Sequence, residues 1–156
     1  MKDNFSPEGV SSLFEQASRL IHGLGFAEGL TPAQWSALRY FAEVPPFSRT
    51  MANLARFQGL TLAPVTRTVK VLVEKGYLDR HPNPRSKRAD LMIVSRTGRE
   101  LLKRAPHSQL ADVISKVPTD DREVIARSMR TIIDGILEIG LPQFDESLYL
   151  DPEEQE

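Results

Sequence analysis

Apolar residues recur every three or four positions along most of the chain, which is the spacing of one face of an α-helix. The first such segment predicts a helix over about residues 8–26, with the apolar positions Leu13, Phe14, Ala17, Leu20, Ile21 and Leu24. A second helix is predicted from Thr31-Pro32, because threonine caps a helix well and proline suits the first helical position. We expect Val44-Pro45-Pro46 to end this second helix.

The next two helical segments are short and adjacent. One is predicted over Thr50–Phe57, where Gly59 breaks it, and the other runs from its cap Thr61 to Lys75, where Gly76 stops it. The positions expected to face the core are Met51, Leu54, Ala55, Val65, Val69 and Leu72. Two helices joined by a tight turn that contains glycine form a helix-turn-helix.

After Gly76 the pattern becomes that of strands. Tyr77–His81 and Leu91–Val94 predict two short strands, and Pro82–Arg88 between them predicts a turn-rich, strongly basic loop. A helix-turn-helix followed by a hairpin with a basic tip is a winged helix. The sequence therefore predicts a mainly α fold with a small β-hairpin wing.

The last helical segments carry an apolar face that needs a partner. Helical spacing resumes near Thr97, and Pro106 is expected to kink or restart the helix. Thr119 or Asp120 is expected to cap a final helix, whose apolar positions are Ile125, Met129, Ile132, Ile133, Ile136 and Leu137. This stripe and that of residues 8–26 either pack on each other within one chain or interlock with a second chain. The frequency of closed two-fold dimers favours the second arrangement.

Charge is distributed unevenly along the chain, although the net charge is only −1. Residues 47–104 hold 13 Lys and Arg against 4 Asp and Glu, a net +9, whereas the remainder holds 7 against 17, a net −10. A basic middle between acidic ends suggests one surface that meets a polyanion. A charged face that only contacts water is the alternative that composition leaves open.

Several function classes are excluded by what the sequence lacks. Without cysteine there are no disulfides and no thiolate metal sites. Stretches free of charge reach only ten residues, as in Gly29–Leu38, and no secretory signal is recognisable, so we expect a cytoplasmic protein that does not span a membrane. The three histidines, His22, His81 and His107, lack ligand spacing, and no nucleophile motif is present. We expect neither an enzyme nor a cofactor.

The ordered set of motifs resembles the MarR family of bacterial regulators. The resemblance lies in Leu30-Thr31-Pro32 to Leu38, Ala52-Asn53-Leu54-Ala55, and Val65-Thr66-Arg67-Thr68-Val69 to Leu78. The family's wing shows Asp-Pro-x-Asp-Arg-Arg, a strand ending in Leu-Thr, and a glycine three residues later. The matching residues here are Asn83-Pro84-Arg85-Ser86-Lys87-Arg88, Val94-Ser95 and Gly98. Both wing aspartates are replaced, so a bracing ion pair made by them is absent or replaced.

The resemblance implies a homodimer that binds a pseudo-palindromic operator and usually represses nearby genes. It covers the chain to about Ile139 and divides it into a winged helix-turn-helix domain over residues 1–144 and an acidic tail over 145–156. Within the domain, the DNA-binding lobe is expected at about 47–104 and the dimerisation helices at about 8–26 and 119–139. The rival interpretation is a winged-helix module that binds protein and has no operator, and the basic wing argues against it.

Double-stranded DNA is the expected partner, and its contacts follow from the fold. A major groove admits one helix, whose N-terminal residues reach the base edges. The expected contacts on the second helix of the motif are Thr61, Ala63, Pro64, Thr66, Arg67 and Lys70, and on the wing Arg85, Lys87 and Arg88. Arg49 and Arg99 are expected to hold phosphates, and Arg88 to enter the minor groove.

The resemblance also implies a small-molecule effector. Relatives often bind small aromatic or anionic compounds between the dimer helices and the DNA-binding lobe. His22, Trp35, Arg39 and Tyr40 lie on helices that would line such a cleft. The alternative is an ordinary structural role, because a tryptophan on an apolar helix face usually belongs to the core.

Overall fold

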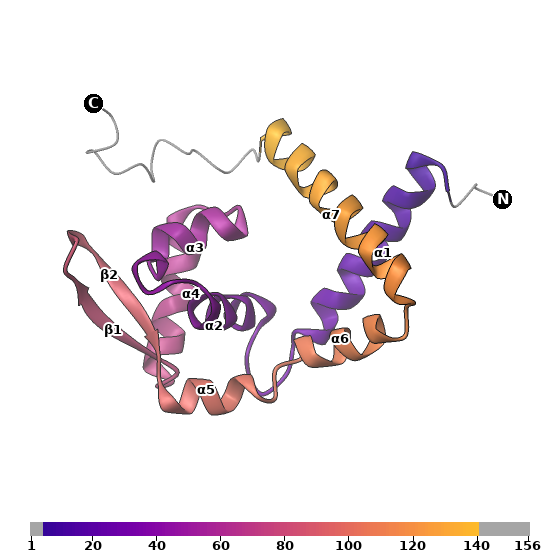
Figure 1. Ribbon diagram of the computed structural model, residues 1–156. Coiled ribbons are helices and arrows are strands. Elements are labelled where there is room, and N and C mark those ends of the chain that lie inside the picture. Colours follow the sequence, from indigo (N-terminus) through magenta and orange to yellow (C-terminus); the bar gives the residue numbers. More distant parts are fainter. Residues whose placement is uncertain (1–4, 141–156) are drawn as a thin grey trace.

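A computed structural model describes residues 5–140 and confirms the predicted fold class, a mainly helical chain with one two-stranded antiparallel sheet at its edge (Figure 1). In chain order the elements are α1 (Pro7–Leu24), α2 (Pro32–Glu43), the 3₁₀ turn η1 (Pro46–Ser48), α3 (Met51–Gln58), α4 (Leu62–Glu74), β1 (Leu78–Asn83), β2 (Ser86–Val94), α5 (Arg96–Leu102), α6 (His107–Ser115) and α7 (Thr119–Ile139). The acidic tail at 145–156 lies outside the described residues. None of the helices in the described part is long and apolar enough to cross a membrane.

Local capping residues set most of the helix boundaries. Thr31 caps α2 through a capping box: its Oγ1 accepts from the Gln34 backbone N–H at 3.3 Å, and its own N–H donates to Gln34 Oε1 at 3.0 Å. Gly59 and Gly76 follow α3 and α4 with φ of 62° and 75°, in the left-handed region that glycine tolerates. Thr61 occupies the cap position of α4, but its side chain makes no capping hydrogen bond.

The cap predicted for the last helix is wrong. Pro118 occupies the N-cap position of α7, and Thr119 is already its first helical residue. The Thr119 hydroxyl accepts a hydrogen bond from the guanidinium of Arg122 at 2.8 Å instead of from a backbone N–H. The first helix also ends two residues earlier than predicted, at Leu24.

The wing strands are longer than predicted, and most of the predicted basic loop belongs to them. β1 continues through Pro82 to Asn83 and β2 begins at Ser86, so that only Pro84 and Arg85 form the turn. The prolines had indicated a loop, but in this two-stranded sheet each strand has an unpaired edge, where a missing N–H is tolerated. The register is irregular between His81 and Asn83, at Pro82 itself.

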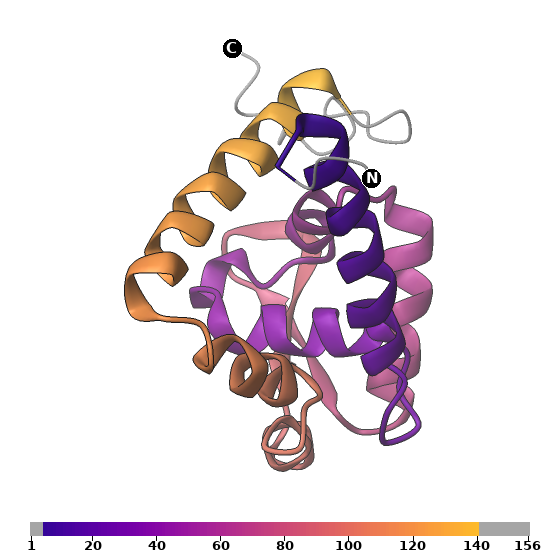
Figure 2. The ribbon, with the colours of Figure 1, turned by 90° about the vertical axis from the view of Figure 1, so that its right-hand side faces the viewer.

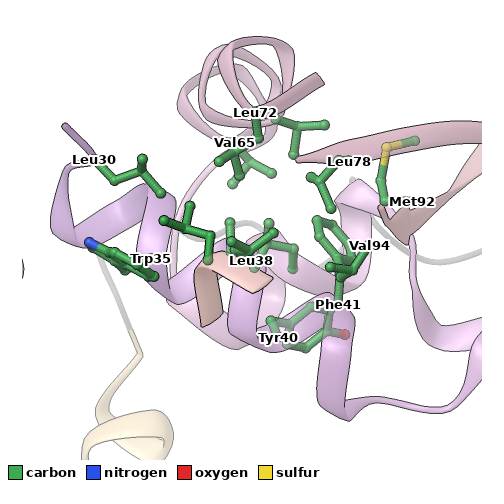
Figure 3. Packing of buried hydrophobic residues seen from close by; sticks show 14 of the residues in the cluster. Leu30, Trp35, Leu38, Tyr40, Phe41, Val65, Leu72, Leu78, Met92 and Val94 are labelled. Carbon is green, nitrogen blue, oxygen red and sulfur yellow. The ribbon is translucent and has the colours of Figure 1, made fainter. Parts of the chain in front are cut away.

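The hydrophobic core is built by α2, α3, α4, the hairpin and α5, which together form the winged lobe (Figure 3). Phe41 and Leu38 of α2 pack against Val65 and Leu72 of α4 and against Met92 of β2, and all five are fully buried. Burying a large apolar side chain stabilises the fold by about 1.5–3 kcal/mol. The lobe that presents α4 and the hairpin is therefore held by a core of its own.

The remaining helices lie outside this core. α1, α6 and α7 gather on one side of the molecule, and α3, α4 and the hairpin lie on the other (Figures 1 and 2). Gly9 is the one buried residue on α1, and α6 and α7 have none. Half of the surface of large apolar side chains on α7 stays exposed, as at Ile125 (49%) and Ile133 (49%). These helices leave a wide apolar surface uncovered in the single chain.

Candidate nucleic-acid interface

The exposed face of α4 presents the residues that the sequence predicted. Ala63, Thr66, Arg67 and Lys70 are exposed, whereas Val65, Val69 and Leu72 on the opposite face are fully buried. Pro64 and Thr61 at the start of the helix are half-buried. The core thus fixes the rotation of α4, so that its polar and basic positions face outward.

The charges on this face are available to a ligand. Arg67 forms no ion pair within residues 5–140. Lys70 lies 3.9 Å from a carboxylate oxygen of Glu74, but both side chains are well exposed, and such surface pairs contribute little. The Thr66 hydroxyl donates to the Leu62 carbonyl at 2.9 Å, which holds it against the helix and leaves its methyl group free.

Neutral side chains organise the tip of the wing at the two positions where the family pattern described above has aspartates. Asn83 Oδ1 accepts from the Arg85 backbone N–H at 3.0 Å, and Ser86 Oγ accepts from the Arg88 backbone N–H at 3.3 Å. Both bonds span two residues, the pattern by which Asn and Ser shape turns. The ion pair that the aspartates would make is thus replaced by hydrogen bonds from neutral side chains, which add no negative charge to the wing.

The cations of the wing tip differ in their surroundings. Lys87 and Arg88 are exposed and form no ion pair in the described part of the chain. Arg85, by contrast, places its guanidinium carbon 3.5 Å from the centroid of the Phe47 ring, in a cation–π contact. Phe47 belongs to η1, and its role was missed by the sequence analysis because no local pattern links positions that lie 38 residues apart.

The two predicted phosphate-binding arginines lie in different places. Arg49 follows η1, and its Nε donates to the Val44 carbonyl at 3.1 Å, while its own carbonyl accepts from Met92 of β2. Arg99 lies on α5, at the base of the hairpin, where it donates to the Val94 carbonyl. About 20 Å of strand separates Val94 from Arg88, at 3.3 Å per residue. The structure therefore places both arginines near the base of the hairpin and neither at the tip of the wing.

A cavity of about 970 Å³ opens between α1, α2, α6 and α7, and three of the four predicted effector residues line it. They are His22, Trp35 and Arg39. Most of the other lining side chains are apolar, among them Leu13, Phe14, Ile21, Leu110, Ile125 and Met129. Trp35 is only 4% exposed, and its indole N–H donates to the Ala27 carbonyl at 3.1 Å, so it also belongs to the core.

Tyr40, the fourth predicted effector residue, does not line the cavity. Its hydroxyl donates to the Ser48 carbonyl at 3.2 Å, and its ring lies 5.0 Å from that of Phe57. Burial raises the pKa of this hydroxyl above its ordinary value, and the positive charge of Arg56 opposes the shift. The hydroxyl therefore keeps its proton at neutral pH and holds η1 against α2. Among the described residues no group of three or more His, Asp or Glu side chains could hold a metal ion.

Comparison with known sequences finds a family match over the centre of the winged lobe. The sequence model of the MarR family matches residues 28–89, from the connection between α1 and α2 into β2. Residues 28–89 are therefore similar to the MarR family. No curated protein matches the chain.

Solved structures of MarR-type regulators share the fold over most of the chain. Sco3205, a MarR family regulator from Streptomyces coelicolor in complex with DNA, aligns with a TM-score of 0.66 and 22% identity over 81% of this chain and 84% of that one. PcaV from the same organism, in complex with its natural ligand, aligns at 0.65 and 19% identity over 86% and 96%. A probable regulator from Pseudomonas aeruginosa gives 0.64 and 22% over 79% and 96%. At these identities the likeness shows a MarR-type fold.

Proposed function

We propose that this protein is a MarR-type transcriptional regulator that binds double-stranded DNA sequence-specifically. The observation that carries the proposal is a set of exposed cations that form no ion pair among the described residues: Arg67 on α4, and Lys87 and Arg88 on the wing. The elements that carry them share one hydrophobic core. A winged-helix module that binds other proteins would not need this concentration of unpaired positive charge. The DNA complex of Sco3205, which has the same fold, supports the same use of the lobe.

The two elements have different roles in this proposal. The first turns of α4 enter the major groove, where Arg67 bonds a guanine and Thr66 contacts a base or a phosphate. Arg88 enters the flanking minor groove, where a narrow A·T-rich sequence concentrates negative potential. Lys87, Lys70 and Arg49 hold phosphates, which positions the protein without reading sequence.

Replacing Arg88 by alanine is expected to weaken DNA binding by about 1–3 kcal/mol, and lysine is expected to restore only part of it. Lysine is more strongly hydrated than arginine and lacks its planar fork. The measurement is fluorescence anisotropy on duplexes with A·T-rich and with G·C-rich flanks. Arg67→Ala is the matched comparison and should relax sequence preference instead. Wild-type affinity of Arg88→Ala on both duplexes would show that Arg88 does not contact the DNA.

A homodimer is the second part of the proposal. The exposed apolar side chains of α1 and α7 are too many for a chain that stays single, and a second copy covers them in the simplest arrangement. Two winged lobes then face a pseudo-palindromic operator, and occupancy of that operator represses the adjacent gene. The same dimer doubles the positive surface that meets the DNA.

The variant Ile133→Asp is expected to raise the dimer dissociation constant about 10- to 100-fold, because each copy of the interface would bury an unpaired carboxylate. Ile133 is 49% exposed in the single chain and lies on the apolar stripe of α7. Thr131→Asp adds the same charge to the polar face of the helix and serves as the control. Light scattering at micromolar concentration should find Ile133→Asp as a monomer and Thr131→Asp as a dimer. Identical masses for the two variants would refute the assignment.

The cavity supports a third part of the proposal, a small aromatic or anionic effector. Arg39, His22 and His107 give a mostly apolar cavity three groups that can bind an anion, and PcaV, with the same fold, holds its natural ligand. Because α1 and α7 line the cavity and also carry the proposed dimer surface, a ligand there would change how the two lobes are spaced. Release of DNA by aromatic carboxylates in the anisotropy assay tests this part.

A further inference from the structure

The hairpin of the wing is long, and few contacts hold its tip. Its buried side chains, Leu78, Leu91, Met92 and Val94, all lie near the base of the hairpin. One further support there is the hydrogen bond from the Met92 N–H to the Arg49 carbonyl, at 2.8 Å. From Leu91 to Ser86 the strand extends about 17 Å at 3.3 Å per residue, and Arg85 lies just beyond it in the turn. A small rotation at the base would therefore displace the cations at the tip by several ångströms.

A contact between Arg85 and Phe47 connects the tip to the body of the lobe. The guanidinium carbon of Arg85 lies 3.5 Å from the ring centroid of Phe47, which is 44% exposed. A cation over an aromatic face at this distance is attracted by the ring quadrupole. A guanidinium stacked in this way gives up its contact with the ring when it extends toward a phosphate.

The 3₁₀ turn η1, which carries Phe47, is itself held in a fixed position. Pro45 and Pro46 restrict the backbone before it. After it, the Ser48 carbonyl accepts from the Tyr40 hydroxyl at 3.2 Å and from Asn53 Nδ2 at 3.3 Å, which attaches η1 to both α2 and α3. The Phe47 ring is therefore held relative to the helix-turn-helix.

Hydrogen bonds within the turn connect Arg85 to the residues that follow it. Asn83 Oδ1 accepts from the N–H of Arg85, and Ser86 Oγ accepts from the N–H of Arg88, so the backbone around the tip is organised by its own side chains. Holding Arg85 in place thus also holds Lys87 and Arg88 relative to α4. Pre-organisation of this kind lowers the entropy lost on binding.

We infer that Arg85 and Phe47 form a pin that sets the position of the wing for DNA binding, and that Arg85 is a positioning residue and not a phosphate contact. This inference rests on the proposed function and changes one of its expected contacts. The wing enters the minor groove through Arg88, and the pin fixes the distance between Arg88 and the recognition helix.

The first arm of the test needs no DNA. In the wild-type protein the ring current of Phe47 should shift the side-chain NMR signals of Arg85 upfield, and Phe47→Leu should return them to the values of a free arginine. Phe57→Leu, which removes another exposed ring of the same lobe that packs on Tyr40, is the control and should leave the Arg85 signals unchanged. Arg85 signals that do not respond to Phe47→Leu overturn the pin whether or not the protein binds DNA.

The second arm measures affinity. Phe47→Leu should weaken DNA binding about 2- to 5-fold for each wing. In a background that carries both Lys87→Gln and Arg88→Ala it should have no further effect, because a misplaced wing without its two DNA-contacting cations has nothing more to lose. A general loss of stability would lower affinity equally in both backgrounds, and that result contradicts the inference, as does wild-type affinity of Phe47→Leu.

The third arm separates a pin from a phosphate ligand. The slope of log affinity against log salt becomes shallower by about 0.9 for each phosphate that the protein no longer neutralises. Lys87→Gln should reduce the slope in this way, whereas Arg85→Gln should weaken binding and leave the slope close to that of the wild type. Equal reductions for the two variants would make Arg85 a phosphate ligand and overturn the inference.

Discussion

The DNA affinity of this protein is expected to fall by about 10³- to 10⁵-fold between 50 and 200 mM salt. The physical reason is that each phosphate neutralised by an arginine or lysine releases condensed counterions, so binding weakens with salt in proportion to the number of phosphates neutralised. A dimer that presents the phosphate contacts Arg49, Lys70 and Lys87 twice, together with two copies of the cationic Arg88, is expected to neutralise about 6–10 phosphates. Residues 47–104, which carry a net +9 per chain, supply this charge.

The measurement is an anisotropy titration at four or more salt concentrations, with the duplex in trace amounts. Lys87→Gln and Arg88→Ala should each reduce the slope, because both remove exposed cations of the wing tip. Lys116→Gln is a matched control, since Lys116 follows α6, away from α4 and the hairpin, and its loss should leave the slope unchanged. A slope near zero for the wild-type protein would be incompatible with a phosphate-binding surface.

Replacing Gly98 by alanine is expected to lower the free energy of unfolding by about 3 kcal/mol. Gly98 lies in the first turn of α5, where the chain passes from the hairpin to the next helix. A Cβ atom there would lie 2.3 Å from the carbonyl oxygen of Tyr77 and 2.9 Å from Cγ1 of Val94. The first neighbour is backbone and cannot rotate away, so α5 must shift.

That shift would strain a junction of several hydrogen bonds. The Tyr77 carbonyl accepts from the Ser95 N–H at 3.0 Å, and the Ser95 hydroxyl both donates to the Gly76 carbonyl and caps α5 at the Gly98 N–H. Thermal unfolding should therefore show a midpoint lower by about 6–12 °C, at 2–4 °C per kcal/mol for a domain of this size. Gly23→Ala, inside α1, is the matched control, because its Cβ would meet nothing within 4 Å, and it should not lower the midpoint. Equal midpoints for the two variants would contradict the close approach.

Local signals predicted the helices of the winged lobe well. Thr31, Gly59 and Gly76 mark helix ends through their own backbone preferences, which do not depend on the rest of the chain. The i, i+4, i+7 spacing of Val65, Val69 and Leu72 likewise determined which face of α4 is buried. The candidate DNA contacts on this helix followed directly, because they are the positions that remain.

Non-local contacts account for what the sequence analysis missed. The pairing of β1 with β2 extends each strand through Pro82 and Ser86, where local composition indicated a loop. The contact between Phe47 and Arg85 joins two segments that no periodicity connects. Tyr40 was predicted to face the effector cavity with Arg39, but successive helix residues are turned by about 100°, and Tyr40 packs on Phe57 instead.

Selection of bound sequences from a random duplex pool tests the central proposal most directly. A dimer that places two recognition helices in successive major grooves should enrich an inverted repeat, with half-sites whose centres lie about 10 base pairs apart. Arg67→Ala should enrich the repeat less strongly, at the base that Arg67 reads. A pool that is retained without enrichment of any sequence, or enrichment of a single unrepeated site, would contradict a dimeric, sequence-specific regulator.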